Sequence, residues 1–215
     1  MKVKICGLKQ EKDIKKSIDL GAWALGFIFY KKSPRFIKPE TAGNIVKNYQ
    51  TDISKKLVGV FVNESLCKMI DVQKKVKFNT FQLHGEESPQ VLSSIDHKFN
   101  VIKKLNYMDF PNIHLFLRAH PKISFLIDAV PGLNGSYGGQ GEISDWSFAR
   151  KVKKKIGPHR KLILAGGLNK KNMVLAKEEV DPFAFDLSSS VESKPGVKDH
   201  KKLKELFSTI QMEVK

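Results

Sequence analysis

The sequence predicts a protein of the α/β class, a single-domain (β/α)8 barrel that takes in residues 1–215. Short apolar, β-branched runs alternate with longer amphipathic segments, which is the pattern of a parallel sheet built from strand–helix units. Eight such pairs in 215 residues give about 27 residues for each unit, which favours a small closed TIM barrel over an open doubly wound sheet. No linker divides the chain, and no G-x-G-x-x-G follows the first apolar run, which weakens a dinucleotide site.

The expected strands are short, mainly apolar runs. In chain order they are Val3–Cys6, Ala24–Phe29, Leu57–Val62, Thr80–Leu83, Asn100–Lys104, Ser124–Asp128, Lys161–Ala165 and Ala184–Asp186. The segments between them space apolar residues as a helix with one buried face does. The expected helices are Glu11–Leu20, Pro39–Tyr49, Ser65–Val76, Pro89–Ile95, Ser144–Lys154, Asn172–Glu178 and Lys198–Met212, with a fifth helix in chain order within Phe110–Ala119.

The composition is that of an ordered globular protein. Hydrophobic residues make up 41% and charged residues 28%, a balance that can bury a core and does not resemble a disordered chain. The two cysteines, Cys6 and Cys67, are too few for a disulfide scaffold or a cysteine-built metal site, and they suit a reducing compartment. The longest early uncharged run, Gly21–Tyr30, is too short to cross a bilayer. We therefore expect a cytoplasmic protein with no membrane partner.

The chain is strongly basic, with a net charge of +16 and a pI near 9.7. Such a charge raises the hypothesis of nucleic-acid binding. The lysines, however, are spread along the chain beside helical periodicity, and no zinc-finger, RNP or basic-zipper spacing accompanies them. We interpret them as solvated helix faces, expect no nucleic-acid partner, and note that the charge would steer a small anionic substrate.

Glycines and serines follow the last two expected strands. Gly166-Gly167 would let backbone N–H groups approach an anion closely, and Ser188, Ser189 and Ser190 open a second turn. Barrel enzymes often bind phosphate with the loops after strands seven and eight. The pattern therefore predicts a phosphate cup, with two ordinary surface turns as the alternative.

Two reactive side chains end other strands. Cys6 is followed by Gly7, whose backbone freedom suits a catalytic thiolate with a pKa lowered by nearby lysines, although a buried packing role is the alternative. Cys67 lies in a helical pattern and is assigned to packing. Asp128 is either a proton donor or a local cap. The glycine-rich segment from Gly132 to Gly141 behind it has the composition of a loop that covers a substrate, with an ordinary surface insertion as the alternative.

Arg35 and His84 are weaker candidates. Arg35, after the second strand, could hold a carboxylate or phosphate through its planar donor fork, or could be a surface arginine. His84, after the fourth strand, could transfer a proton or satisfy a local hydrogen bond. No H-E-x-x-H, metal-spaced histidine pair, Walker loop or G-x-S-x-G occurs, so we expect no metal and neither a nucleotide site nor a serine-hydrolase site.

Short motifs lie at the ends of the expected strands over nearly the whole chain. They include Lys4-Ile5-Cys6-Gly7-Leu8, Gly26-Phe27-Ile28-Phe29, Ser33-Pro34-Arg35, Gly59-Val60-Phe61-Val62-Asn63, Gln82-Leu83-His84-Gly85, Gly138-Gly139-Gln140-Gly141, Leu164-Ala165-Gly166-Gly167-Leu168 and Ser188-Ser189-Ser190-Val191-Glu192. In this order and spacing they resemble the phosphoribosylanthranilate isomerase family of tryptophan biosynthesis.

The resemblance implies a cofactor-free Amadori rearrangement of a small anionic phosphosugar–anthranilate substrate. It assigns Asp128 the role of general acid toward the furanose ring oxygen, and Cys6 that of general base toward C2′. It also implies that Arg35 pairs with the anthranilate carboxylate, while Gly167 and the serine turn hold the phosphate. We expect a monomer or a homodimer.

Two residues depart from the family pattern. Ser190 stands where the family usually has glycine, and a left-handed backbone there would add strain of about 1 kcal/mol and weaken phosphate binding. Gln140 stands where threonine is common. The alternatives are another phosphate-binding barrel, such as the histidine-pathway isomerase, and a basic nucleic-acid-binding barrel without turnover. The histidine-pathway isomerase pairs two aspartates, whereas the first strand here ends in Cys6.

Overall fold

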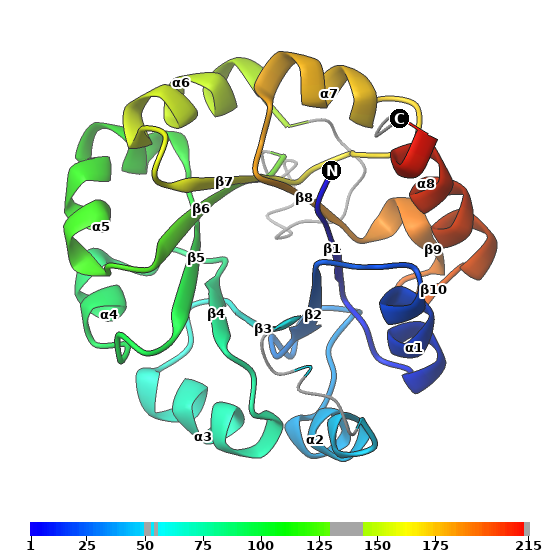
Figure 1. Cartoon of the computed structure of the whole chain (residues 1–215). Helices are drawn as coiled ribbons and strands as arrows, with labels where there is room; N and C mark the ends of the chain where they lie inside the picture. Colours follow the sequence, from blue (N-terminus) through cyan, green and yellow to red (C-terminus); the bar gives the residue numbers. More distant parts are fainter. Residues whose placement is uncertain (50–52, 54–55, 130–143, 213–215) are drawn as a thin grey trace.

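The computed structural model describes residues 1–49, 53, 56–129 and 144–212. Its strands β1 to β8 follow one another in chain order around a closed barrel, and β8 pairs with β1 in parallel register. Figure 1 looks down this barrel and shows the helices in a ring outside the strands. The predicted (β/α)8 barrel is confirmed, and the open sheet is excluded.

The strands and helices alternate as the periodicity predicts. The barrel strands are β1 (Val3–Cys6), β2 (Ala24–Ile28), β3 (Leu57–Phe61), β4 (Thr80–Leu83), β5 (Asn100–Lys104), β6 (Ile123–Ile127), β7 (Lys161–Leu164) and β8 (Ala184–Leu187). The α-helices are α1 (Glu11–Asp19), α2 (Pro39–Lys47), α3 (Leu66–Val76), α4 (Pro89–Ser93), α5 (Ile113–Ala119), α6 (Trp146–Ile156), α7 (Met173–Val180) and α8 (His200–Met212).

Most differences from the sequence expectation lie at element ends, where backbone hydrogen bonds fray. β6 ends at Ile127, so that Asp128 is the first residue after the strand. The fifth helical segment has two parts, because a 3-10 helix, η2 (Tyr107–Asn112), precedes α5. The Asn106 backbone N–H donates to the Asp109 carboxylate at 3.0 Å and caps the start of η2.

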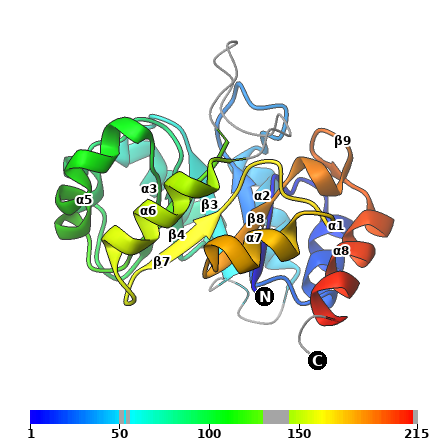
Figure 2. The ribbon, with the colours of Figure 1, turned by 90° about the horizontal axis from the view of Figure 1, so that it is seen from above.

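A small antiparallel ribbon between β8 and α8 was not expected from the sequence. It consists of β9 (Glu192–Lys194) and β10 (Val197–Lys198), and it follows the short 3-10 helix η3 (Ser189–Val191). In Figure 2 the N-terminus lies at one end of the barrel, and β9 lies toward the other. The ribbon therefore stands at the end where the parallel strands finish.

Two apolar cores hold the barrel together. Because strand side chains alternate between faces, the larger core lies between the strands and the helices, with fully buried residues such as Phe27, Phe81 and Phe125. The smaller core fills the interior from Val58, Ile102 and other small or branched side chains. Within the described part of the chain, no helix has the length and apolar composition needed to cross a membrane.

Candidate active site

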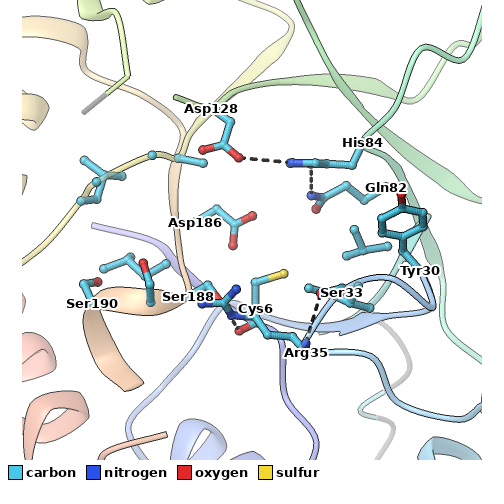
Figure 3. Close-up of a pocket in the computed structure, with 18 of the residues that line it drawn as sticks. Cys6, Tyr30, Ser33, Arg35, Gln82, His84, Asp128, Asp186, Ser188 and Ser190 are labelled. Atoms are coloured by element: carbon cyan, nitrogen blue, oxygen red, sulfur yellow. Dashed lines mark hydrogen bonds and ion pairs between the residues drawn. The ribbon is translucent and has the colours of Figure 1, made fainter. Parts of the chain in front are cut away.

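A pocket opens at the carboxyl ends of the strands, and it brings together every site residue that the sequence predicts. Its lining includes Cys6, Arg35, His84, Asp128, Gly166, Gly167, Ser188, Ser189 and Ser190. Figure 3 shows the Asp128–His84 pair on one side, Cys6 and Arg35 on the other, and Asp186 between them. Parallel strands all finish at the same end of a barrel, so residues far apart in sequence meet there.

Cys6 ends β1 and is only 7% exposed. Gly7 turns the chain with a left-handed φ of 75°, and a Cβ at this position would lie 2.7 Å from Arg35 Cδ. Burial raises the pKa of the Cys6 thiol, and Lys4 and Lys198 offset this only in part. The expectation that nearby lysines lower the thiol pKa toward neutrality is therefore wrong: the lysines are present, but desolvation outweighs them. Cys67 is exposed on α3, so its assignment to packing is also wrong.

Asp128 and His84 form a buried pair that joins the loop after β6 to the loop after β4. His84 Nε2 lies 3.2 Å from Asp128 Oδ2, and His84 Nδ1 lies 3.1 Å from the Gln82 amide nitrogen. Because that amide nitrogen donates to Nδ1, the imidazole carries its hydrogen on Nε2 and directs it at the carboxylate. The Ala129 N–H donates to Asp128 Oδ1 at 2.8 Å. Although burial opposes ionisation, His84 and the Ala129 N–H lower the pKa of Asp128.

The predicted phosphate cup has the backbone that close approach of an anion requires. Gly166 and Gly167 both have left-handed φ, 80° and 58°, after β7. Across from them, Ser189 and Ser190 lie in η3, the first turn after β8. Ser190 is not among the non-glycine residues with positive φ. The left-handed backbone that would have strained Ser190 is therefore not present, because a 3-10 turn needs no left-handed residue there.

Replacement of Gly166 by alanine is expected to damage the cup. The added Cβ would lie 2.4 Å from the Ala129 backbone nitrogen, at a φ that alanine seldom adopts. Since Ala129 follows Asp128 directly, relief of this clash would move the carboxylate as well. We expect Gly166→Ala to cost about 1–3 kcal/mol of unfolding free energy and to raise KM. Gly157→Ala is the control, since a Cβ there would share the positive φ but meet no atom within 4 Å. Equal effects of the two replacements would contradict the prediction.

Arg35 is held by an acidic residue that the sequence reasoning did not select. Its Nε lies 3.1 Å from both carboxylate oxygens of Glu192, and its Nη2 lies 2.8 Å from Oε2. Lys198 Nζ donates to Glu192 Oε1 at 2.8 Å and to the Ser188 carbonyl at 3.2 Å. The Arg35–Glu192–Lys198 network thus joins the loop after β2 to the serine turn, and it fixes the plane of the guanidinium.

Other polar residues of the site were missed because their partners are distant in sequence. Lys4 and Asp186, on β1 and β8, form an ion pair at 2.7 Å inside the barrel. A usable signal was present, since Lys4 precedes Cys6 by two residues and therefore shares its face of the strand. The glycine-rich segment proposed to cover the substrate lies within 130–143, outside the described residues. Among the residues that the structure describes, no group of three or more His, Cys, Asp or Glu is arranged to hold a metal ion.

Titratable side chains at the strand ends, beside glycine and serine turns in the loops after β7 and β8, are the arrangement typical of one class of proteins, the phosphate-binding (β/α)8-barrel enzymes. This chain has that architecture. Residues 3–209 match the model of the N-(5'-phosphoribosyl)anthranilate (PRA) isomerase family, and the chain belongs to that family.

Individual relatives agree over almost the full length. The chain is 39% identical over 208 residues to N-(5'-phosphoribosyl)anthranilate isomerase from Thermotoga neapolitana, covering 96% of this chain and 97% of the relative. It is similar to a monomeric form of the dimeric isomerase from Thermotoga maritima, with a TM-score of 0.81, 34% identity and 99% of each chain covered. It is also similar to a phosphoribosyl anthranilate isomerase in complex with reduced 1-(o-carboxyphenylamino)-1-deoxyribulose 5-phosphate, with a TM-score of 0.80, 34% identity and 99% of each chain covered. The protein is thus an isomerase of tryptophan biosynthesis.

Proposed function

We propose that this isomerase converts N-(5'-phosphoribosyl)anthranilate to 1-(2-carboxyphenylamino)-1-deoxyribulose 5-phosphate with Asp128 as general acid and Cys6 as general base. The observation that carries the proposal is the shared pocket: a carboxylate after β6 and a thiol at the end of β1 line the same cavity as the glycine and serine turns. Two proton-transfer groups on different strands can reach one sugar from two sides.

The reaction needs one proton delivered and one removed. Asp128 protonates the furanose ring oxygen, and the ring opens to a Schiff base between C1′ and the anthranilate nitrogen. The Cys6 thiolate then takes the proton from C2′ and becomes a thiol, which leaves an enolamine that tautomerises to the ketose. His84 orients the Asp128 carboxylate through its Nε2 hydrogen, at 3.2 Å.

Binding of the two anionic ends orients the sugar between these groups. The phosphate lies against the backbone of Gly166 and Gly167 and the turn that Ser188 to Ser190 form, remote from the reacting carbons. Glu192 engages the Nε and Nη2 side of the Arg35 guanidinium, so its remaining side is the one that meets the anthranilate carboxylate. Such remote contacts supply orientation without taking part in proton transfer.

The two pKa shifts predict an unusual pH dependence. The pKa of Asp128 lies below its ordinary 3.8 and that of Cys6 above its ordinary 9.0, so the resting protein holds its proton on Cys6. The reactive form holds it on Asp128 and contains the same number of protons. The fraction of the protein in the reactive form is therefore constant between the two pKa values. We expect kcat/KM to be independent of pH from about pH 5 to pH 8. A tenfold rise per pH unit in that range, as for a lone titrating thiol, would contradict this assignment.

The direct test follows the fluorescence of freshly prepared phosphoribosylanthranilate as the purified protein consumes it. We expect rapid loss well above the uncatalysed rate, with the ketose identified by mass spectrometry. Cys6→Ser should slow turnover at least about 100-fold, whereas Cys67→Ser, at the exposed thiol on α3, should retain it. No loss above background in the wild-type protein would refute the proposed function.

Four further expectations stay predictions. We propose that the chain works in a reducing cytoplasm, supported by two unpaired cysteines, and that it is a monomer or a homodimer without nucleic-acid affinity. Analytical ultracentrifugation distinguishes the two states, and nonspecific nucleic-acid binding would collapse between low and physiological salt. We also propose that residues 1–215 unfold as one domain, in a single denaturant transition.

A further inference from the structure

A lysine that the proposed mechanism does not use lies inside the barrel, two residues before Cys6 on β1. Lys4 is 0% exposed, and its Nζ donates to Asp186 Oδ2 at 2.7 Å. Because Lys4 and Cys6 are two residues apart on β1, both side chains point into the barrel. Burial of an ammonium is unfavourable because it loses its hydration, and an apolar residue would fill the same layer without that cost. The charge at this position therefore points to a chemical role.

The strand next to β1 brings the ammonium and the sulfur together. Gly26 on β2 is the register partner of Cys6. A Cβ at Gly26 would lie 2.7 Å from Cys6 Sγ and 3.1 Å from Lys4 Nζ. The sulfur and the ammonium therefore lie close to the same point of β2, which is open because residue 26 is glycine, and the ammonium attracts a thiolate electrostatically.

The charges around Cys6 act in opposite directions. Lys4 on β1 and Lys198 on β10 attract a thiolate, Asp186 on β8 repels it, and the Asp128–His84 pair lies across the pocket. Asp186 nevertheless stabilises the charged form of Lys4. Although burial opposes its charge, the Asp186 carboxylate and Cys6 raise the pKa of Lys4, so that the ammonium stays protonated inside the barrel.

We propose that Lys4 is the positioning residue that stabilises the Cys6 thiolate. Its importance for turnover rests on the proposed role of Cys6 as base. Lys4 lies on the side of Cys6 toward the start of β1, while the substrate approaches from the carboxyl ends of the strands. The barrel interior thus supplies the positive charge that a thiolate base needs without placing a cation next to the sugar.

The test measures the thiolate directly, without substrate. In a Cys67→Ser background, Cys6 is the remaining thiol, and its alkylation by iodoacetamide is followed by mass spectrometry from pH 6 to pH 10. Lys4→Met removes the attraction and should slow alkylation at pH 8 about tenfold, since one pKa unit is a factor of ten. Asp186→Asn removes the repulsion and makes the thiolate the main buried counter-charge of Lys4, so alkylation should be several-fold faster.

Shifts of the alkylation midpoint in opposite directions in Lys4→Met and Asp186→Asn would support the proposal. A purely structural ion pair would instead give two destabilised proteins whose midpoints shift in the same direction or not at all. Lys103→Met is the matched control. Lys103, on β5, is also 0% exposed and pairs with Glu87 at 3.1 Å. Its replacement should lower the stability of the protein and leave the alkylation midpoint of Cys6 unchanged. If Lys4→Met does not fold, the double variant Lys4→Met/Asp186→Asn is compared with Asp186→Asn, and a lower midpoint in the double variant would overturn the proposal.

The alkylation experiment tests the role of Lys4, and the isomerase assay tests the proposed function, so each can be refuted without the other. Opposite shifts in a protein that does not isomerise phosphoribosylanthranilate would refute the proposed function and leave Lys4 as the partner of the thiolate. Normal turnover with unchanged alkylation midpoints would refute the role of Lys4 alone. With both correct, Lys4→Met lowers kcat and leaves KM nearly unchanged, because Lys4 makes no contact with the phosphate turns.

Discussion

Asp128→Asn is expected to lower kcat by about three orders of magnitude, within the range that loss of a general acid produces. The amide is the same size and can still accept the Ala129 N–H that now lies 2.8 Å from Oδ1. It cannot carry a proton acidic enough to give to the sugar ring oxygen. KM should change little, because the phosphate turns and Arg35 are untouched. Single-turnover fluorescence with circular dichroism separates this loss from misfolding.

Two controls sharpen the prediction. Asp96→Asn makes the same chemical change at an exposed carboxylate that pairs with Lys98, and it should leave kcat unchanged. His84→Ala should have a smaller effect than Asp128→Asn, because His84 orients the carboxylate and is not the donor to the sugar. An Asp128→Asn protein with more than a tenth of wild-type kcat would exclude Asp128 as the acid.

Glu192→Gln is expected to cost about 3–5 kcal/mol of unfolding free energy, the usual result when one member of a buried ion network is removed. Glu192 is the shared counter-charge of Arg35 and Lys198, at 2.8 Å from each. The amide would leave two buried cations without it. Equilibrium unfolding in guanidinium chloride measures the loss, and KM should rise as well because Arg35 loses its fixed orientation.

The pH dependence of this loss follows from the sign of the shift. Burial opposes ionisation of Glu192, but Arg35 and Lys198 outweigh it and lower the pKa of this carboxyl. Its stabilisation is thus present above the unfolded pKa of about 4.3 and disappears as the pH falls through the folded value. The difference in unfolding free energy between the wild type and Glu192→Gln should therefore disappear at acidic pH. Glu205→Gln, at an exposed pair with Lys170, should cost less than about 1 kcal/mol at any pH; equal costs would refute the network.

Much of the fold could be predicted because its signals are local. Alternation of apolar strands with amphipathic helices located every barrel strand to within one or two residues at each end. The same reasoning found Cys6, Asp128 and the glycine and serine turns, since chemistry in this architecture gathers where strands end. The ribbon of β9 and β10 was missed, because its five residues carry no periodicity that distinguishes them from a loop.

The sequence by itself determined the eightfold architecture, the family resemblance and the reactive groups at the strand ends, because periodicity and motif order are properties of neighbouring residues. Only the tertiary structure decided the partners of those groups. Lys4 pairs with Asp186, Arg35 with Glu192, and His84 with Asp128. The members of each pair are far apart in sequence, and the barrel fold brings them into contact. It also decided the direction of the Cys6 pKa, since burial and the distance to each charge are set by packing and not by composition.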